Sequence, residues 1–459
     1  MGSRLASTRG VARRSLPAAV LALEQWLRIP SVSGVPAHRG DVRRAAEWAE
    51  QRLRRMTRDV RVVTAPDGPV VVAHIVAAGR ARSVATLVVY GHLDVKPPGP
   101  GWTSRPFVPV RRGNRLIARG ASDDKGQLMA HLVALEAWAV SGGPPCDVIV
   151  VIDGAEEIGS PGLAAVLDGV RDRVARGRNV VAVLVSDTRA AGAGRPTLTV
   201  SQRGMLTARL TVDVGGREVH AGRFGGAVVD PSLVLSGALL RAVSAVTAMA
   251  ASERTAQEPT DDAMRVASGG RAMIADRPAT RATTRAAASV TSLRAGGTPG
   301  AIPTRATAEL DIRLPPGALP MRARAVVATA VASADATAVH LRWGMSHPGT
   351  VLRHSPGIRR ALRAACRAGF GVDAVDVSSG GSIPAVALLR SAFGVHPILL
   401  GFGPCNDNAH GPNEHLDLHD WGCGVDTSVV FMENLARTFR AKPRPMFAEI
   451  SRPLSTSGR

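Results

Sequence analysis

Continuous runs of apolar residues occur along the chain at 85–90, 147–152, 180–185 and 397–400. Runs without alternation are typical of strands covered on both faces, as in a mainly parallel sheet. Helical patterns lie between these runs, for example at 126–140 and 162–174. Because predicted strands and helices alternate, we expect a doubly wound α/β layer.

The pattern changes near residue 206. Residues 206–214 and 306–314 alternate between apolar and polar side chains, which is typical of strands with one exposed face. A polar segment at about 251–287 lies between them, and we expect it to be a long surface loop. The α/β pattern resumes near residue 350. The sequence therefore predicts an α/β domain formed by 1–205 and 346–459, and a smaller inserted α+β domain formed by 206–345.

The first 30 residues superficially resemble a signal sequence, because a pair of arginines precedes an apolar stretch. However, Glu24 and Arg28 interrupt that stretch, and no small-residue cleavage site follows. Apolar residues recur there at helical spacing, namely Leu16, Val20, Leu23 and Leu27. We predict an amphipathic helix packed on a core. No apolar run approaches the roughly 20 residues needed to cross a bilayer, so we expect no membrane partner.

The formal net charge of +20 is carried almost entirely by arginine, since lysine occurs only at positions 96, 125 and 442. A basic chain can indicate nucleic-acid binding. Here the arginines are scattered and no aromatic residues are interleaved with them to stack on bases, so we expect no nucleic-acid partner. The four cysteines form no C-x-x-C pair, and scattered reduced cysteines are typical of a cytoplasmic protein.

Polar residues gather where the predicted strands end. They are His92 and Asp94 after the first run, Glu156 and Glu157 after the second, Asp187 after the third and His410 after the fourth. Asp123 lies in the polar turn that opens the helix from Gly126. Ligands bind at the carboxyl ends of strands in open α/β sheets, so we expect these side chains to converge on one crevice.

Two histidines and three carboxylates would give mixed nitrogen and oxygen ligation, which suits zinc, cobalt or manganese better than calcium or magnesium. Asp123 and Glu157 each belong to a pair of adjacent acids. One acid of a pair can bind metal while its neighbour handles protons, and like charges held close together require a cation between them. For Asp124 we expect a structural role, with a salt bridge to Lys125.

Six segments in this order resemble a known family of dinuclear metallopeptidases, which includes carnosine dipeptidase, carboxypeptidase G, acetylornithine deacetylase, succinyl-diaminopimelate desuccinylase and aminoacylase. The segments are Tyr90-Gly-His-Leu-Asp-Val-Lys-Pro97, Ala118-Arg-Gly-Ala-Ser-Asp-Asp-Lys-Gly126, Gly154-Ala-Glu-Glu-Ile-Gly-Ser160, Ser186-Asp-Thr188, Gly380-Gly-Ser-Ile-Pro384 and Ala409-His-Gly-Pro-Asn-Glu414. The dipeptidase branch fits best, through Trp102-Thr-Ser-Arg-Pro-Phe107 and the prolines after Lys96.

The resemblance implies two divalent metal ions, with zinc expected and cobalt or manganese as alternatives. Asp123 would bridge the ions, His92 and Asp187 would complete one site, and Glu157 and His410 would complete the other. Asp94 would hydrogen-bond the far nitrogen of His92 and fix its tautomer. Glu156 would be the general base on a metal-bridging water and would pass the proton to the leaving amine. Glu414 is a candidate support for the His410 loop and receives no chemical role.

By the same resemblance, the inserted domain would be a lid that also mediates homodimer formation. His220 would stabilise the transition state, either within one subunit or across the dimer. Arg313 would clamp a substrate carboxylate with help from Gly381 and Ser382, because a planar guanidinium binds a carboxylate through two hydrogen bonds. The chain departs from the family pattern by having Glu-Val-His-Ala-Gly around His220 and Ser378-Ser379 before Gly380.

We therefore expect a metal-dependent hydrolase that cleaves the amide bond of a dipeptide or short peptide with a free carboxylate. A related amidohydrolase that removes an N-acyl or N-carbamoyl group from an amino acid is the alternative. A non-catalytic binding protein of the same fold is a third hypothesis, which predicts the loss of a ligand or of the base. All five ligands, Asp94 and Glu156 are present in the sequence.

Overall fold

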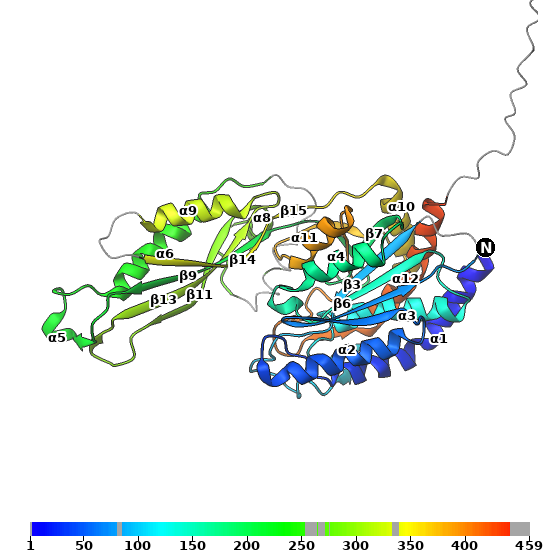
Figure 1. Cartoon of the computed structure of the whole chain (residues 1–459), viewed down its shortest axis with the longest axis horizontal. Coiled ribbons are helices and arrows are strands. Elements are labelled where there is room, and N and C mark those ends of the chain that lie inside the picture. The colour runs from blue at the N-terminus through cyan, green and yellow to red at the C-terminus, as the bar shows by residue number, and fades with distance from the viewer. Residues whose placement is uncertain are drawn as a thin grey trace, which may run out of the picture.

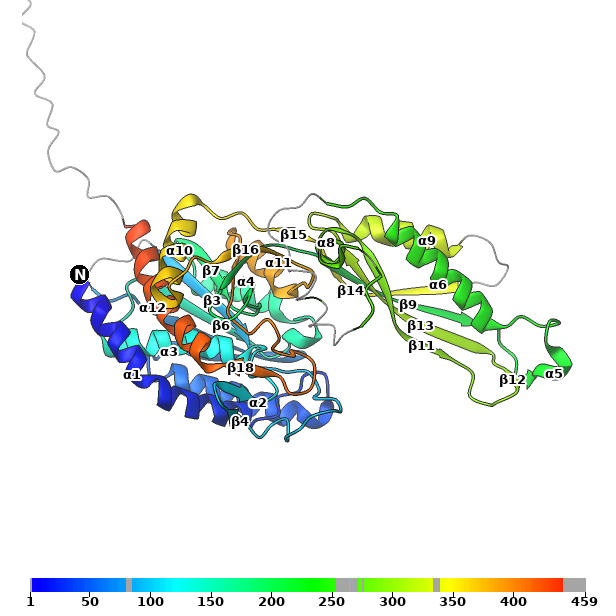
Figure 2. The same ribbon diagram turned by 180° about the vertical axis from the view of Figure 1, so that it is seen from behind.

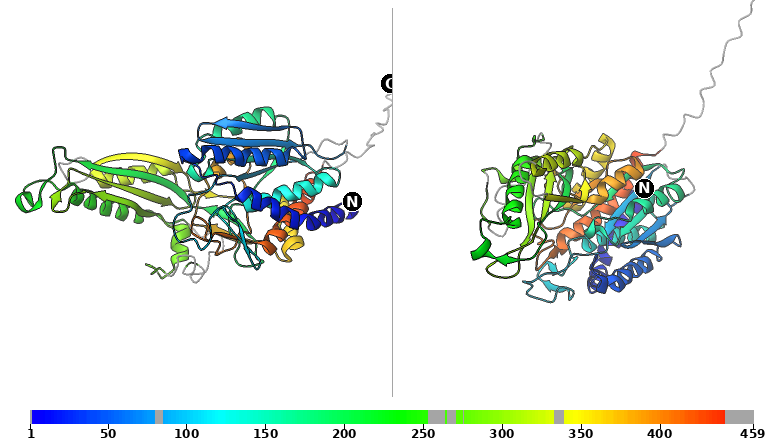
Figure 3. Two further views of the ribbon diagram at one scale, coloured as in Figure 1. Left: turned by 90° about the horizontal axis from the view of Figure 1, so that it is seen from below. Right: turned by 60° about the vertical axis from the view of Figure 1, so that its left-hand side comes forward.

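The computed structural model describes residues 2–79, 85–252, 264, 271–274, 276–332 and 339–440. The described residues form a wide lobe and a narrower lobe that projects from one end of it (Figure 1). The views from behind and from below show the same two lobes, with the N-terminus at the end of the wide lobe away from the narrow one (Figure 2 and the left view of Figure 3).

The wide lobe is built on a nine-stranded sheet. Its order is β1 (Val60–Ala65), β2 (Gly68–Ile75), β6 (Asp147–Asp153), β3 (Thr86–His92), β7 (Val180–Val185), β17 (Ile398–Gly401), β8 (Thr197–Gln202) and β15 (Thr350–Val351), with β16 (Val375–Ser379) also paired to β8. The central strands β6, β3, β7 and β17 are parallel, whereas β1, β2 and β15 join antiparallel. These four central strands match the four continuous apolar runs, so the prediction of a mainly parallel sheet is confirmed.

Helices cover both faces of this sheet. One face carries α1 (Gly2–Leu27), α2 (Arg39–Leu53), α3 (Lys125–Val140), α10 (Pro356–Phe370) and α12 (Leu418–Thr438), and the other carries α4 (Leu163–Arg173) and α11 (Pro384–Phe393). In β3, Leu87 and Val89 belong to the first core, whereas Val88 and Tyr90 belong to the second. Successive strand side chains point to opposite faces, so a strand between two helical layers must be apolar throughout.

The predicted N-terminal helix is confirmed and is longer than its apolar pattern. Helix α1 begins at Gly2, and Val20, Leu23 and Leu27 are buried against the core. Short elements complete the wide lobe, namely the 3-10 helices η1 (Pro36–His38) and η2 (Glu156–Ile158) and the sheet of β18 (His415–Asp417), β5 (Arg115–Ile117) and β4 (Val110–Arg112). Among the described residues, none of the helices combines the length and apolar character needed to cross a bilayer.

The narrow lobe is an antiparallel sheet with helices on one side. The strand order is β11 (Ala287–Ala295), β13 (Arg305–Leu314), β9 (Gly204–Asp213) and β14 (Val339–His347), and the helices are α6 (Pro231–Thr247) and α9 (Pro320–Ala332). Burial alternates along β9 and β13 because one face packs on these helices. The fold class, a doubly wound α/β layer with an inserted α+β lobe, is therefore confirmed. At the far tip lie β10 (Val219–His220), α5 (Ala221–Phe224) and β12 (Ala301–Ile302) (Figure 2).

The expectation of a surface loop throughout 251–287 is wrong at its end. Residues there form helix α8 (Pro278–Thr284), and Thr283 and Thr284 are buried. Their hydroxyls donate to the carbonyl oxygens of Ala279 and Thr280, at 3.0 and 2.8 Å. Threonine satisfies its polar atom in this way, so a polar sequence can still be buried. The parts of this segment at 253–263, 265–270 and 275 lie outside the described residues.

Candidate metal centre and active site

Five segments from the wide lobe bring the predicted metal ligands together. The ligand atoms form two groups, within each of which all atoms lie within 4.8 Å of one another. One group contains His92, Asp123 and Asp187, and the other contains Asp123, Glu157 and His410. The same two sets of three were implied by the family resemblance, and their role as metal ligands stays a prediction. They meet because β3, β6, β7 and β17 are parallel and end at one edge of the sheet.

Asp123 belongs to both groups because its two carboxylate oxygens face different histidines. Its Oδ1 lies 3.1 Å from Nε2 of His92, and its Oδ2 lies 3.0 Å from Nε2 of His410. His410 Nε2 is also 3.2 Å from Oε2 of Glu157, and His92 Nε2 is 3.9 Å from Oδ2 of Asp187. The peptide bond between Asp123 and Asp124 is cis.

The charges of this cluster depend strongly on one another. Burial opposes the charged form of His92, but hydrogen bonds to Asp123 and Asp94 outweigh it and hold the imidazole pKa well above its usual value. Bonds to Asp123 and Glu157 raise the pKa of His410 to about 10. Burial would raise the pKa of Asp123, yet the two histidines hold it below its usual value. Burial raises the pKa of Asp187.

The donor set fits divalent metal ions. Each group combines one imidazole nitrogen with two carboxylate oxygens, which is a common set for zinc. Three carboxylates this close repel one another unless positive charge lies between them. His92 and Asp123 would contribute to one ion with Asp187, and His410 and Asp123 to the other with Glu157.

Asp94 ties His92 to the turn that carries the two glutamates. Nδ1 of His92 lies 3.0 Å from the backbone oxygen of Asp94 and 3.5 Å from its carboxylate. The Asp94 carboxylate also accepts hydrogen bonds from the backbone N–H groups of Glu156 and Glu157, at 3.1 and 3.0 Å. One buried carboxylate therefore orients both His92 and the paired acids.

Glu156 is buried beside the cluster and makes no ligand contact in either group. Burial raises the pKa of its carboxyl to about 8, although His92 opposes the shift. A carboxyl with such a pKa can take up and release a proton near neutral pH.

The turn that carries Glu156 and Glu157 also packs closely against the narrow lobe. A Cβ atom built on Gly159 would lie 2.8 Å from Sδ of Met345 in β14, so the space between the two residues is too small for a side chain at position 159.

The salt bridge expected between Asp124 and Lys125 does not form. Lys125 Nζ instead donates to the backbone oxygens of Trp26 and Ile29, at 3.1 and 2.9 Å, and burial lowers its pKa to about 7. Oδ2 of Asp124 accepts the backbone N–H of His92 at 3.3 Å. Neighbouring residues at the start of a helix point in different directions, so adjacency in sequence did not produce contact.

The residues predicted on the narrow lobe are not gathered at this cluster. His220 is exposed, its Nδ1 accepts the N–H of Gly222 at 3.0 Å, and α5, which follows it directly, lies at the tip farthest from the wide lobe (Figure 1). Arg313 lies where the lobes meet. Its guanidinium donates through Nε and Nη2 to Asp311, at 2.7 and 2.9 Å, and through Nη1 to the hydroxyl of Ser382 at 3.0 Å. Gly381, beside Ser382, donates its N–H to Ser379 Oγ at 3.1 Å.

Two cationic residues near the site were missed from sequence. Lys96 Nζ lies 3.2 Å from Oε2 of Glu157, and it also donates to the backbone oxygen of that residue. Arg203 is half-buried and donates through Nε to the backbone oxygen of Gly380 at 3.0 Å, and desolvation lowers its pKa to about 10, with Arg313 acting in the same direction. Lysine is so rare in this chain that its presence inside a ligand segment was a usable signal for Lys96.

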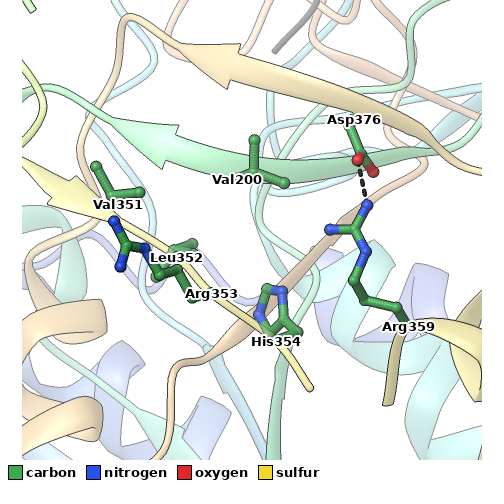
Figure 4. Close-up of a pocket in the computed structure, with 7 residues that line it drawn as sticks. All are labelled: Val200, Val351, Leu352, Arg353, His354, Arg359 and Asp376. Carbon is green, nitrogen blue, oxygen red and sulfur yellow. Dashed lines mark hydrogen bonds and ion pairs between the residues drawn. The ribbon is translucent and has the colours of Figure 1, made fainter. Parts of the chain in front are cut away.

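A separate cavity of about 400 Å³ lies at the edge of the sheet between β8, β15, β16 and the start of α10 (Figure 4). Its lining is Val200, Val351, Leu352, Arg353, His354, Arg359 and Asp376. It contains none of the predicted site residues, and Arg359 pairs there with Asp376. We therefore assign it no part in the chemistry of the metal cluster.

Mixed imidazole and carboxylate groups at the carboxyl edge of a doubly wound sheet, beside a buried glutamate, define a metal-dependent hydrolase. Residues 88–434 match the family described as peptidase family M20/M25/M40, and the chain belongs to that family.

Named relatives include the Cys-Gly metallodipeptidase dug1 of Schizosaccharomyces pombe, which is 26% identical over 391 residues that cover 78% of this chain and 81% of the relative. The Beta-Ala-His dipeptidase of Homo sapiens is 31% identical over 228 residues, which cover 46% of this chain and 44% of the relative. The solved structure of the di-peptidase Dug1p from Saccharomyces cerevisiae has a TM-score of 0.81 at 22% identity, covering 97% of this chain and 100% of that chain. At that identity, the structural likeness shows the fold.

Proposed function

We propose that this chain is a dinuclear metallodipeptidase, which hydrolyses the amide bond of a dipeptide or short peptide with a free carboxylate. The observation that carries the proposal is the Asp123 carboxylate, whose two oxygens each face a different histidine with a further acid. The names of the two relatives, a Cys-Gly metallodipeptidase and a Beta-Ala-His dipeptidase, support a dipeptide substrate.

We propose His92, Asp123 and Asp187 as ligands of one zinc ion and Asp123, Glu157 and His410 as ligands of the other. Bound zinc supplies Lewis-acid polarisation of the scissile carbonyl and lowers the pKa of a coordinated water. Every other step belongs to protein groups. The Glu156 carboxylate accepts the proton of the attacking water and delivers it to the nitrogen of the leaving amine. Asp94 holds the Glu156 backbone during this transfer.

Substrate orientation would come from the junction of the lobes. Arg313 reaches Ser382 across this junction, and Ser382 and Gly381 belong to the wide lobe. A guanidinium hydrogen-bonded to a substrate carboxylate would fix the scissile carbonyl relative to the metal cluster. Asp311 accepts N–H groups from Nε and Nη2 of Arg313, and Ser382 accepts one from Nη1, so we assign the remaining N–H groups of Nη1 and Nη2 to the substrate carboxylate.

We propose that His220 acts on the site of a second subunit in a homodimer. Its exposed position at the tip of the narrow lobe supports action across subunits. Exposed apolar side chains on the same lobe support pairing there, with Leu233 and Leu240 on α6 exposed by 73% and 72% and Leu293 on β11 by 57%.

We propose that the catalytic domain is formed by 1–205 and 346–459 and that the lid is formed by 206–345. These boundaries lie close to the start of β9 and the end of β14. Four free cysteines support a cytoplasmic location.

A substrate panel tests the proposed reaction. Zinc-loaded protein should release free amino acids from dipeptides faster than it releases an acid or a carbamate from N-acyl and N-carbamoyl amino acids. Mass spectrometry of the products at early times would measure both. Exclusive cleavage of the N-acyl or N-carbamoyl compounds would replace the dipeptidase assignment with the related amidohydrolase.

A further inference from the structure

The carboxylate of Glu414 is fully buried and accepts hydrogen bonds from one turn, residues 119–123. Its Oε1 accepts the backbone N–H groups of Ser122 and Asp123, at 2.9 and 3.0 Å. Its Oε2 accepts the N–H of Gly120 at 3.0 Å and a guanidinium N–H of Arg119 at 2.7 Å. Four donors from the segment 119–123 therefore converge on a single side chain that comes from the loop carrying His410.

Asp407, in the same loop, makes a second set of links. Its Oδ2 accepts the hydroxyl of Ser122 at 2.7 Å, and its Oδ1 accepts the N–H of Ala409 at 3.0 Å. Arg189, which lies two residues after Asp187, pairs with the same carboxylate at 2.8 Å. Asp407 is also buried, whereas the side chain of Arg189 is 48% exposed, so Asp407 joins the segments of Asp123 and His410 in the interior and that of Asp187 at the surface.

We propose that Glu414 and Asp407 are positioning residues, a carboxylate clasp that fixes the spacing between the segments carrying Asp123, Asp187 and His410. The inference rests on the proposed metal centre, because the clasp acts on its ligands. Neither carboxylate of the clasp belongs to the two groups of candidate metal ligands. It acts through the backbone of Asp123, the hydroxyl of Ser122 and the guanidinium of Arg189.

The backbone of the loop explains why such fastening is needed. Asn408, His410 and Asn413 have φ angles of 57°, 65° and 59°. Residues with a side chain adopt this left-handed region at an energetic cost, and they keep it only where surrounding contacts impose it. Asparagine and histidine occur in this region more often than most side chains do, but three such residues within six positions still incur a cost. The contacts of Asp407 and Glu414 on either side of His410 supply that constraint.

The buried carboxylate of Glu414 also needs a positively charged partner, which is Arg119. Glu414 and Arg119 have relative side-chain exposures of 0% and 1%, and a buried charge is tolerated when it is paired and fully hydrogen-bonded. Arg119 additionally lies with its guanidinium carbon 5.4 Å from the centroid of the Trp102 ring. The carboxylate of Glu414 is therefore satisfied by its four donors, whereas Nε of Arg119 has no hydrogen-bond partner among the described residues.

The test measures zinc affinity in the full chain carrying Glu414→Gln or Ser122→Ala, by competition with a chromogenic chelator. Groups that orient metal ligands typically change affinity by about 10–100-fold, so we expect a loss in that range for Glu414→Gln. Ser122→Ala removes only the hydroxyl link to Asp407, and we expect a smaller loss, about threefold to tenfold. Ser122→Ala carries the test if Glu414→Gln fails to fold.

Two matched controls separate positioning from a general loss of stability. Asp426→Asn removes a buried carboxylate of α12 that pairs with Arg9, and Ser428→Ala removes a buried hydroxyl that hydrogen-bonds His131. Both should lower the melting temperature and leave the zinc dissociation constant within about twofold of the unchanged chain. Wild-type affinity in folded Glu414→Gln and Ser122→Ala would overturn the clasp while leaving the proposed function intact. Failure of the unchanged chain to bind zinc would instead overturn the proposed function.

Discussion

The metal cluster and the tip of the narrow lobe differ in how complete they are within one chain. At the cluster, every predicted ligand is already within contact distance of another, and supporting carboxylates hold the backbone. At the tip, His220 is exposed and its ring accepts the backbone N–H of the nearby Gly222. A single chain thus brings together the groups that we propose for metal binding and proton transfer, whereas the residue that we propose for transition-state stabilisation lies on a distant element. This contrast motivates four experiments of decreasing expected effect.

The largest effect should come from the proton carrier. Glu156→Gln keeps the shape of the side chain but removes its basic oxygen, so kcat should fall by about 10²–10⁴-fold while metal content stays unchanged. The matched variant is Glu157→Gln, which should lower the occupancy of one ion. Kinetics and elemental analysis on the same preparations measure both. Substantial turnover by Glu156→Gln would remove it from the mechanism.

The next largest loss of activity is expected from a substitution at the tip of the narrow lobe. His220→Ala should lower kcat by about 10²–10³-fold, which is typical for the loss of a group that stabilises a developing negative charge. Mixed dimers of His220→Ala and Glu156→Gln chains decide where His220 acts. If it acts across subunits, each mixed dimer contains one intact site and activity returns on mixing. Absence of recovery in dimers shown to be mixed would place His220 with its own chain or outside the reaction.

A smaller effect is expected at the junction of the lobes. Arg313→Ala should lower kcat/KM for free-acid dipeptides by roughly tenfold to a hundredfold, because a hydrogen bond to a charged group contributes about 1.5–3 kcal/mol. The loss should be much smaller for C-terminally amidated dipeptides, which carry no carboxylate. Steady-state kinetics on matched acid and amide pairs provide the comparison. Equal losses on both would show that Arg313 does not clamp the carboxylate.

The smallest effect concerns stability away from both regions. Hydrogen bonds from Arg9 and Arg13 outweigh burial and lower the pKa of Asp426. A depressed folded-state pKa means that this contribution is present above the unfolded pKa, about 4, and is lost as pH falls through the folded value. Asp426→Asn should reduce the free energy of unfolding by about 1–2 kcal/mol at pH 7 and by less at pH 3. Urea unfolding at the two pH values measures this, and an equal loss at both would contradict it.

The sequence predicted the central strands of the wide lobe better than it predicted individual side-chain contacts and short helices. Continuous apolar runs mark β3, β6, β7 and β17 because a strand between two helical layers has no polar face. The candidate ligands could be named because metal binding demands particular residue types, and strand ends place them at one edge. The partner of Lys125 and the helix at 278–284 could not be foreseen, because both depend on side-chain direction and on hydroxyls that bond to their own helix.

The pairing of Arg313 with Asp311 shows another limit of sequence reasoning. The two residues lie on the same face of β13 because strand side chains alternate, and this spacing was visible in the sequence. Whether Arg313 turns to Asp311, to Ser382 or to solvent depends on how the lobes meet. That meeting involves residues far apart in the chain, such as Gly159 and Met345, which no local pattern relates.

The most direct test of the account is a metal titration of activity. Protein stripped with a chelator and dialysed should hydrolyse no dipeptide, and activity should return as zinc is added, reaching its maximum at about two ions per chain by elemental analysis. The prediction follows from two ligand groups that share Asp123. Full activity in protein shown to contain no divalent metal would contradict the central claim.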